Sequence, residues 1–111
     1  MASLYVIGPV TGIEDDNIAE FERVKEALRI AGHKARIPHE FVGEAWAWQY
    51  AMGISIREML SMTRLSTPLF PHRKYDGVAM LDGWEQSDGA RIEHDTAASL
   101  GIPCKPWREW L

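Results

Sequence analysis

The sequence is poor in the residues that cross-link a chain or hold a metal ion. It contains one cysteine, Cys104, among 111 residues, which excludes an intramolecular disulfide and a cysteine-based zinc site. The four histidines are scattered over separate segments. His94 and Asp95 do not form a metal pair, because adjacent residues on a helix face different directions. We therefore predict neither a metal site nor a cofactor.

Long apolar runs and clusters of basic residues are missing as well. The chain has no run of about 18 apolar residues, and its first residues lack the basic and apolar regions of a signal peptide. We therefore expect no membrane span and a location in the reducing cytoplasm. A net charge of −4 without a basic cluster argues against a polymeric nucleic acid as partner, because neutralising its phosphates needs a basic face. A small nucleotide is still compatible, since a few backbone N–H groups can bind one phosphate.

What the chain does contain is typical of a globular protein. Hydrophobic residues make up 46% and charged residues 25% of it, and the length indicates one domain over residues 1–111. Short apolar runs rich in β-formers, each bounded by glycine or proline, read as buried parallel strands. Four segments fit this description: Leu4–Ile7, Lys34–Ile37, Asp76–Leu81 and Ile102–Lys105.

Three helices are expected between these strands. Apolar residues at three- and four-residue steps mark residues 18–31, with acidic residues suited to a helix N-terminus before them and Gly32 as the stop. The second helix is predicted over Tyr50–Leu65, although Gly53 weakens it, and the third over Gly89–Leu100. This alternation predicts an α/β fold with a parallel sheet covered on both faces. Ligands of such sheets bind beyond the carboxyl ends of the strands.

Two loops at that edge of the sheet are candidate binding elements. The first, Gly8-Pro9-Val10-Thr11-Gly12, joins the first strand to the first helix. Its glycines allow the backbone to approach a ligand closely, and the helix that follows offers unpaired N–H groups and a positive dipole end. The loop matches neither the phosphate-binding nor the dinucleotide-binding glycine motif. A tight turn without a ligand is an equally good interpretation of it taken alone.

The second loop runs from Asp82 to Gly89 and carries the stronger signal. Ser87 or Asp88 can cap the third helix, so the N–H groups near Gly89 and Ala90 point toward the crevice. Glu93 follows about one turn into that helix. Taken alone, Glu93 is better explained as a first-turn glutamate favoured by the helix dipole. No nucleophile-elbow motif is present, so serine-based nucleophilic catalysis is not supported.

Tryptophan is frequent, with five in the chain. Trp84 lies in the second loop and is a candidate to stack on a base or to wall off a sugar. Trp107 and Trp110 lie in the C-terminal tail, where we favour packing or subunit contact over ligand binding, since tryptophan is enriched in interface cores.

These motifs together resemble the nucleoside 2-deoxyribosyltransferase superfamily. The resemblance covers nearly the whole chain. It is closest to a small branch of the superfamily found often in phages and bacteria, and the 2′-deoxynucleoside 5′-monophosphate N-glycosidases are similar relatives. The segments that carry it are Tyr5–Gly12 (YVIGPVTG), Gly83–Glu93 (GWEQSDGARIE) and Ala97–Pro103 (AASLGIP).

The resemblance implies a flavodoxin-like α/β/α sandwich with a small parallel sheet of four to five strands, and a homo-oligomer. It also implies that Glu93 is the nucleophile that attacks C1′ of the sugar and displaces the base, as in retaining glycosidases. Tyr5 and Gly8 match positions that line the sugar and base pocket. Ser87 and Gly89 match the phosphate-binding turn of the monophosphate hydrolases.

Two segments depart from the family pattern. Ser55, in the stretch SIREML, stands where the family usually has an aspartate that handles the leaving base. A hydroxyl does not donate a proton as a carboxylic acid does. Asp82, Glu85 or Asp88 could take that role if their side chains reach the leaving base. The segment Thr63–Tyr75 is longer than the expected connection and suits a lid, a subunit contact or a plain loop.

The function expected from the sequence is therefore N-glycosidic bond hydrolysis or deoxyribosyl transfer on a (deoxy)nucleoside or nucleotide. The alternative is a binding protein for a nucleotide or sugar phosphate that has kept the pocket and lost the chemistry, and a third possibility is a partner-binding protein with a tryptophan-rich tail. Glu93 is the expected catalytic residue. The expected substrate-binding residues are Tyr5, Gly8, Pro9, Thr11, Gly12, Asp82, Trp84, Ser87, Gly89 and Ala90.

Overall fold

A computed structural model describes residues 1–111 and contains one four-stranded sheet in which every strand pair is parallel. The strand order is β2-β1-β3-β4. The strands are β1 (Ser3–Ile7), β2 (Lys34–Arg36), β3 (Gly77–Met80) and β4 (Cys104–Pro106). The helices are α1 (Ile18–Ile30), α2 (Trp48–Met59) and α3 (Asp88–Ser99), with short 3₁₀ helices η1 (Glu14–Asn17), η2 (Pro38–Glu40), η3 (Trp84–Gln86) and η4 (Trp107–Trp110).

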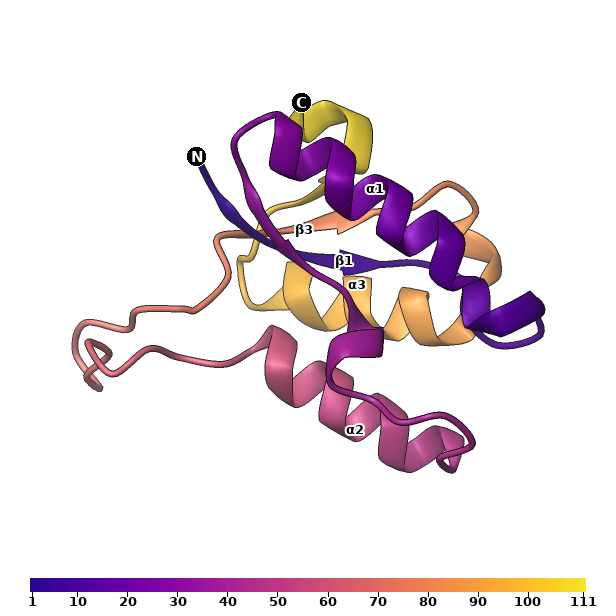
Figure 1. Ribbon diagram of the computed structural model, residues 1–111. Coiled ribbons are helices and arrows are strands. Elements are labelled where there is room, and N and C mark those ends of the chain that lie inside the picture. The colour runs from indigo at the N-terminus through magenta and orange to yellow at the C-terminus, as the bar shows by residue number, and fades with distance from the viewer.

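The sheet is the middle layer of a sandwich. Figure 1 shows α1 on one face of the sheet, with α3 and α2 on the other. Alternate residues of a strand point to opposite faces. Leu4 and Val6 of β1 accordingly pack in the cluster that holds α1, and Tyr5 and Ile7 pack in the cluster that holds Met59 of α2. The α/β fold with strand order 2-1-3-4 is that of a flavodoxin-like sandwich, as predicted.

The second helix ends earlier than the sequence pattern predicts. It runs from Trp48 to Met59 rather than from 50 to 65, so Trp48 is helical and not part of an irregular loop. Beyond it, the backbone N–H of Thr63 donates to the His72 carbonyl and Met62 forms an antiparallel bridge with Arg73. This pairing between two segments of the same chain takes the place of further helical turns. Met62 continues the helical period of apolar residues but lies 47% exposed.

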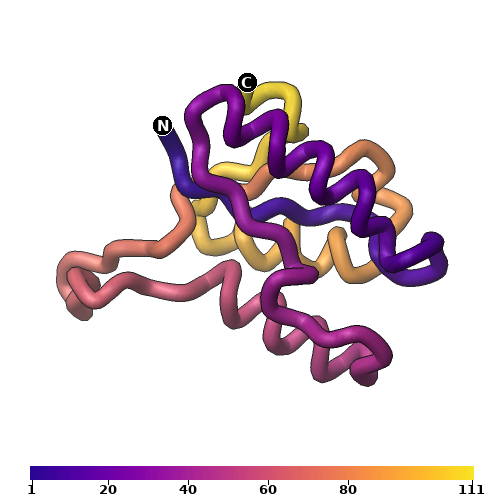
Figure 2. Tube along the Cα trace, in the orientation of Figure 1, coloured from indigo at the N-terminus to yellow at the C-terminus, as the bar shows by residue number.

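Residues 61–75 form an extension that we call the arm. Figures 1 and 2 show it reaching away from the sheet and the helices. Leu65, Leu69 and Phe70 of the arm are at least three-quarters exposed.

Other element boundaries also differ from the prediction. Asp15 and Asp16 lie before α1, which begins at Ile18 as predicted, and they adopt left-handed conformations with φ near +50°. The last strand begins at Cys104 rather than Ile102. The third helix ends at Ser99, one residue before the predicted Leu100. On α3, Ala90 and Ala97 are buried and Ala98 is exposed.

The C-terminal tail folds back onto the sheet. Trp107 is 5% exposed and belongs to the core on the α1 side. The Trp110 indole N–H donates to the Val78 carbonyl at 3.1 Å. Both tail tryptophans thus pack within the fold, one of the two roles expected for them. No helix combines the length and the apolar character that crossing a bilayer requires.

Candidate functional site

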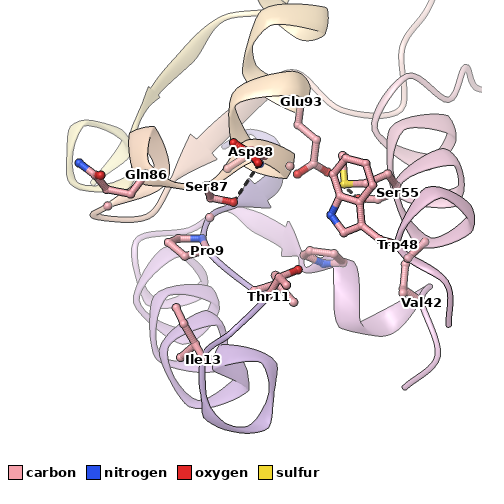
Figure 3. Close-up of a pocket in the computed structure, with 18 residues that line it drawn as sticks. Pro9, Thr11, Ile13, Val42, Trp48, Ser55, Gln86, Ser87, Asp88 and Glu93 are labelled. Atoms are coloured by element: carbon pink, nitrogen blue, oxygen red, sulfur yellow. Dashed lines mark hydrogen bonds between the residues drawn. The ribbon is translucent and has the colours of Figure 1, made fainter. Parts of the chain in front are cut away.

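A pocket of about 620 Å³ lies where the strand order of the sheet reverses. From β1 the chain continues to β2 on one side of β1, and it later returns as β3 on the other side. The loops after β1 and β3 therefore diverge at this edge, which is where open parallel sheets bind ligands. Both loops line the pocket, together with one face of α2 and the beginning of α3 (Figure 3).

Glu93 forms part of the pocket wall from the α3 side. Ser87 begins the helix, and its Oγ accepts the backbone N–H of Ala90 at 3.2 Å, which satisfies one of the free donors of the first turn. Glu93 then lies one turn further on and is only 5% exposed. A buried carboxylate is costly unless it finds a polar partner.

That partner is Ser55 on α2. The Ser55 hydroxyl donates to Glu93 Oε2 at 2.6 Å, and the Tyr5 hydroxyl lies 2.7 Å from Ser55 Oγ. Because the single Ser55 proton is directed to Glu93, the Tyr5 hydroxyl is the donor in the second bond. The three side chains form a one-way relay from β1 through α2 to α3, and Tyr5 and Ser55 are both buried.

Burial makes Glu93 a weaker acid than an exposed glutamate. Removal from water raises its pKa from 4.5 to about 7, and the hydrogen bond from Ser55 opposes part of that rise by stabilising the anion. No other carboxylate or cation contributes to the shift. Burial, with a further contribution from Glu93, also raises the pKa of the Tyr5 hydroxyl well above its usual range. Glu93 is therefore poised between its two protonation states near neutral pH.

The structure brings most of the sequence-predicted site residues together around this carboxylate. Those that line the pocket with Glu93 are Gly8, Pro9, Thr11, Ser87, Gly89 and Ala90.

The other four predicted residues do not line it. Tyr5 lies behind Ser55, and Gly12 sits in the turn with φ of +83°. Asp82 forms an ion pair with Arg108 at 2.7 Å. The Trp84 ring lies against the His94 ring, with centroids 4.5 Å apart, and packs on the core.

Of the wall contributed by α2, the resemblance points to the position of Ser55, whereas Trp48, Ala51 and Met52 are not predicted from the sequence. Trp48, Ala51, Met52 and Ser55 line the pocket, and they recur at steps of three, one and three residues. This spacing places them on one helix face. Periodicity alone could therefore have identified the face, had the helix been predicted to begin at Trp48. Trp48, at 43% exposure, is the aromatic wall of the pocket, and it lies beside Ser55 and Glu93 in Figure 3.

The charges in the pocket wall have one sign. Asp88 and Glu93 line it, and no lysine, arginine or histidine does. The Asp88 carboxylate is 80% exposed and pairs with the Arg91 guanidinium. The positive end of α3 adds a partial charge near the Ser87–Ala90 turn, suited to an anion. The structure holds no group of three His, Cys, Asp or Glu side chains that could bind a metal ion.

Fold and pocket together define the chain as a flavodoxin-like α/β protein with a buried glutamate in a pocket at the switch point of its sheet. A family model described as Domain of unknown function (DUF4406) matches residues 2–105. The chain belongs to this family. No curated protein matches the sequence.

Proposed function

We propose that the protein cleaves the N-glycosidic bond of a (deoxy)nucleoside or nucleotide with Glu93 as the nucleophile, as a hydrolase or a deoxyribosyltransferase. The observation that carries the proposal is the buried Glu93 carboxylate, held by Ser55 in a pocket that also contains the α3 N-terminus. The resemblance to the nucleoside 2-deoxyribosyltransferase superfamily supports the same reaction class.

The proposed reaction has two steps. A Glu93 oxygen bonds to C1′ of the sugar while the C1′–N bond breaks, and the bonding electron pair leaves with the base. Water, or the nitrogen of a second base, then attacks C1′ and releases the Glu93 carboxylate. The Ser87–Ala90 turn would hold a 5′-phosphate at the helix N-terminus, and Gly8, Pro9 and Thr11 would shape the sugar site.

The first test is base release from a panel of nucleosides and nucleoside 5′-monophosphates, with ribose and deoxyribose forms of each base. The wild type should release base from at least one of them, and Glu93→Gln should lose at least about 10³-fold, because the covalent route is then closed. Asp95→Asn is the matched control. Asp95 is an exposed carboxylate on the same helix, outside the pocket, and its loss should leave the rate unchanged. Equal activity of wild type and Glu93→Gln would refute the proposal.

A second candidate is a protein that binds the nucleotide without cleaving it. The observation that favours it is Ser55, a hydroxyl that contacts Glu93. In the nucleoside 2-deoxyribosyltransferase superfamily, which the sequence resembles, this position usually holds an aspartate. This candidate predicts thermal stabilisation without turnover. A ligand at 100 times its dissociation constant adds roughly 2.7 kcal/mol of stability. A shift with no base release would support this candidate against the enzyme, and no shift with any nucleotide would refute both.

We further propose that the protein works as a homo-oligomer in the cytoplasm. The exposed apolar side chains of the arm, Leu65, Leu69 and Phe70, support self-association, because contact with a second copy would remove them from water. Sedimentation equilibrium should give a mass above the 12.6 kDa of one chain. A monomer at micromolar concentration would refute the proposed oligomer.

A further inference from the structure

In the proposed reaction, the base has to leave the sugar without a proton from a general acid. The residues of the pocket wall indicate which kind of base can do so. We propose, on the basis of the function proposed above, that the protein acts on N-glycosides whose base carries a positive charge at the glycosidic bond, such as pyridinium and N7-alkylated purine nucleotides. Such a base leaves as a neutral molecule, whereas an ordinary purine or pyrimidine leaves as an anion unless an acid protonates it.

The first argument is the supply of protons in the pocket. Glu93 and Asp88 are the two carboxyl groups in its wall. Glu93 must be ionised to attack C1′, so it cannot hold the proton that the leaving base needs. Asp88 is largely exposed and engaged as the anionic partner of Arg91. A general acid contributes typically 10²- to 10⁴-fold to such a step, and a substrate with a cationic base does not need it.

Asp82 and Glu85 do not take over the role of acid. The Asp82 carboxylate pairs with Arg108, and the guanidinium holds its pKa below the usual range, partly offset by burial. Glu85 is exposed, and neither residue lines the pocket. The hydroxyls that do line it, Thr11, Ser55 and Ser87, can donate a hydrogen bond but do not release a proton near neutral pH.

The second argument is independent and concerns charge. The wall holds no basic side chain, and Glu93 is its one buried carboxylate, so the ionised Glu93 favours a cation over a neutral or anionic base. Trp48 adds an aromatic face beside Glu93, and the negative face of an indole ring attracts a cation. The positive end of α3 lies at the Ser87–Ala90 turn and suits the single phosphate of a mononucleotide.

The step balances without an added acid. One Glu93 oxygen forms a bond to C1′, the C1′–N bond breaks, and its electron pair stays on the ring nitrogen, which changes from cationic to neutral. Water then attacks C1′, the C1′–O bond to Glu93 breaks, and the proton of the water passes to solvent. The relay from Tyr5 through Ser55 stabilises the Glu93 anion before it attacks C1′ and after it is released from C1′.

The test compares substrates that differ by one methyl group: 7-methyl-2′-deoxyguanosine 5′-monophosphate with 2′-deoxyguanosine 5′-monophosphate, and the corresponding ribonucleotides. Base release is measured after subtraction of the uncatalysed rate. In at least one sugar series, kcat/KM for the methylated member should exceed that of its partner by about a hundredfold or more, the lower range of what a general acid supplies. Nicotinamide mononucleotide serves as the pyridinium probe and should be cleaved as well.

Two variants separate charge selection from damage to the fold. Ser55→Asp places a carboxyl group beside Glu93 and should lower the ratio of the two kcat/KM values at least tenfold, because the unmethylated base gains an acid. Ser55→Ala removes the same hydroxyl without adding an acid and should leave that ratio unchanged. The ratio cancels any loss of folded protein, which affects both substrates equally.

The outcomes distinguish this inference from the function on which it rests. Equal or faster cleavage of the unmethylated nucleotides would overturn the inference and leave Glu93-dependent glycosidase activity standing. No cleavage of any of these probes would overturn the inference alone. No base release from any member of the wider nucleoside and nucleotide panel, or cleavage that survives Glu93→Gln, would overturn both. A preference for the methylated member that is the same in Ser55→Asp would overturn the assignment of the missing acid to position 55.

Discussion

The chemical properties of Glu93 depend mostly on the residues that surround it in the fold. The sequence places it one turn into a helix, where a glutamate is ordinary. Its burial, its contact with Ser55 and its raised pKa come from α2 and β1, which lie far away in the sequence. Ser55 is a mismatch when it is compared with the nucleoside 2-deoxyribosyltransferase superfamily that the sequence resembles. In the structure it is the direct hydrogen-bond partner of the candidate nucleophile.

The raised pKa of Glu93 makes stability depend on pH. Folding moves this pKa from 4.5 to about 7, so the native state binds more protons than the unfolded state between these values, and stability falls as pH rises through this window. A shift of this size corresponds to roughly 3 kcal/mol. Glu93→Gln removes the titration and should be more stable than the wild type at pH 8, with little difference at pH 4.5. Urea unfolding of both proteins across pH 4–8 measures this, and parallel curves would contradict the shift.

Loss of the Ser55 hydroxyl should change the acidity of Glu93 in a known direction. In Ser55→Ala the carboxylate loses the hydrogen bond that favours its charged form, so its pKa rises further. The acid limb of the pH profile of kcat/KM, which reports the free enzyme, should move to higher pH. Ser55→Thr keeps the hydroxyl and should move the limb back toward that of the wild type. A limb that stays in place in Ser55→Ala would show that Ser55 does not tune Glu93.

At the scale of elements, local sequence signals predict where strands and helices occur better than where they end. The four strands and three helices occupy the predicted segments because their apolar runs and periodicities are strong. The end of α2 could not be predicted, since Leu60 and Met62 continue its apolar period. Beyond the helix, Thr63 pairs with the His72 carbonyl instead of continuing the helical hydrogen bonds. The left-handed conformations of Asp15 and Asp16, just before α1, likewise carry no local sequence signal.

Packing between β3 and η4 depends on a glycine. A Cβ added at Gly77 would lie 2.4 Å from Cη2 of Trp110 and 3.1 Å from the Pro103 carbonyl oxygen. Gly77→Ala should therefore displace the indole, break its hydrogen bond to Val78, and destabilise the fold by about 1–3 kcal/mol.

Gly53→Ala is the matched control for this substitution. Gly53 lies in α2, and an added Cβ there meets nothing within 4 Å. Helix propensity predicts a gain of up to about 1 kcal/mol. Chemical denaturation of both variants checks the pair, and a neutral Gly77→Ala would show that the tail is not held against β3.

At the scale of the whole molecule, the order of the strands decides where the pocket lies. The alternation of strands and helices predicts a parallel sheet and a crevice at the carboxyl ends of its strands. The sequence does not show that β1 and β3 are neighbours, or that α2 lies over the loop edge and supplies Trp48 and Ser55. These depend on packing across the sheet, where Tyr5, Met59 and Tyr75 share one core cluster. For this reason the sequence suggests Trp84 as the aromatic wall of the pocket, whereas Trp48 lines the pocket in the structure.

The central claim is that Glu93 attacks C1′, and the covalent intermediate is its most direct evidence. A 2-fluoro-sugar analogue of the substrate found by the base-release assay slows both steps, because the fluorine destabilises the oxocarbenium-like transition state. Mass spectrometry of the wild type incubated with this analogue should show one added glycosyl group, located by fragmentation on Glu93, and no adduct on Glu93→Gln. Base release without an adduct, or an adduct on another residue, would contradict the account.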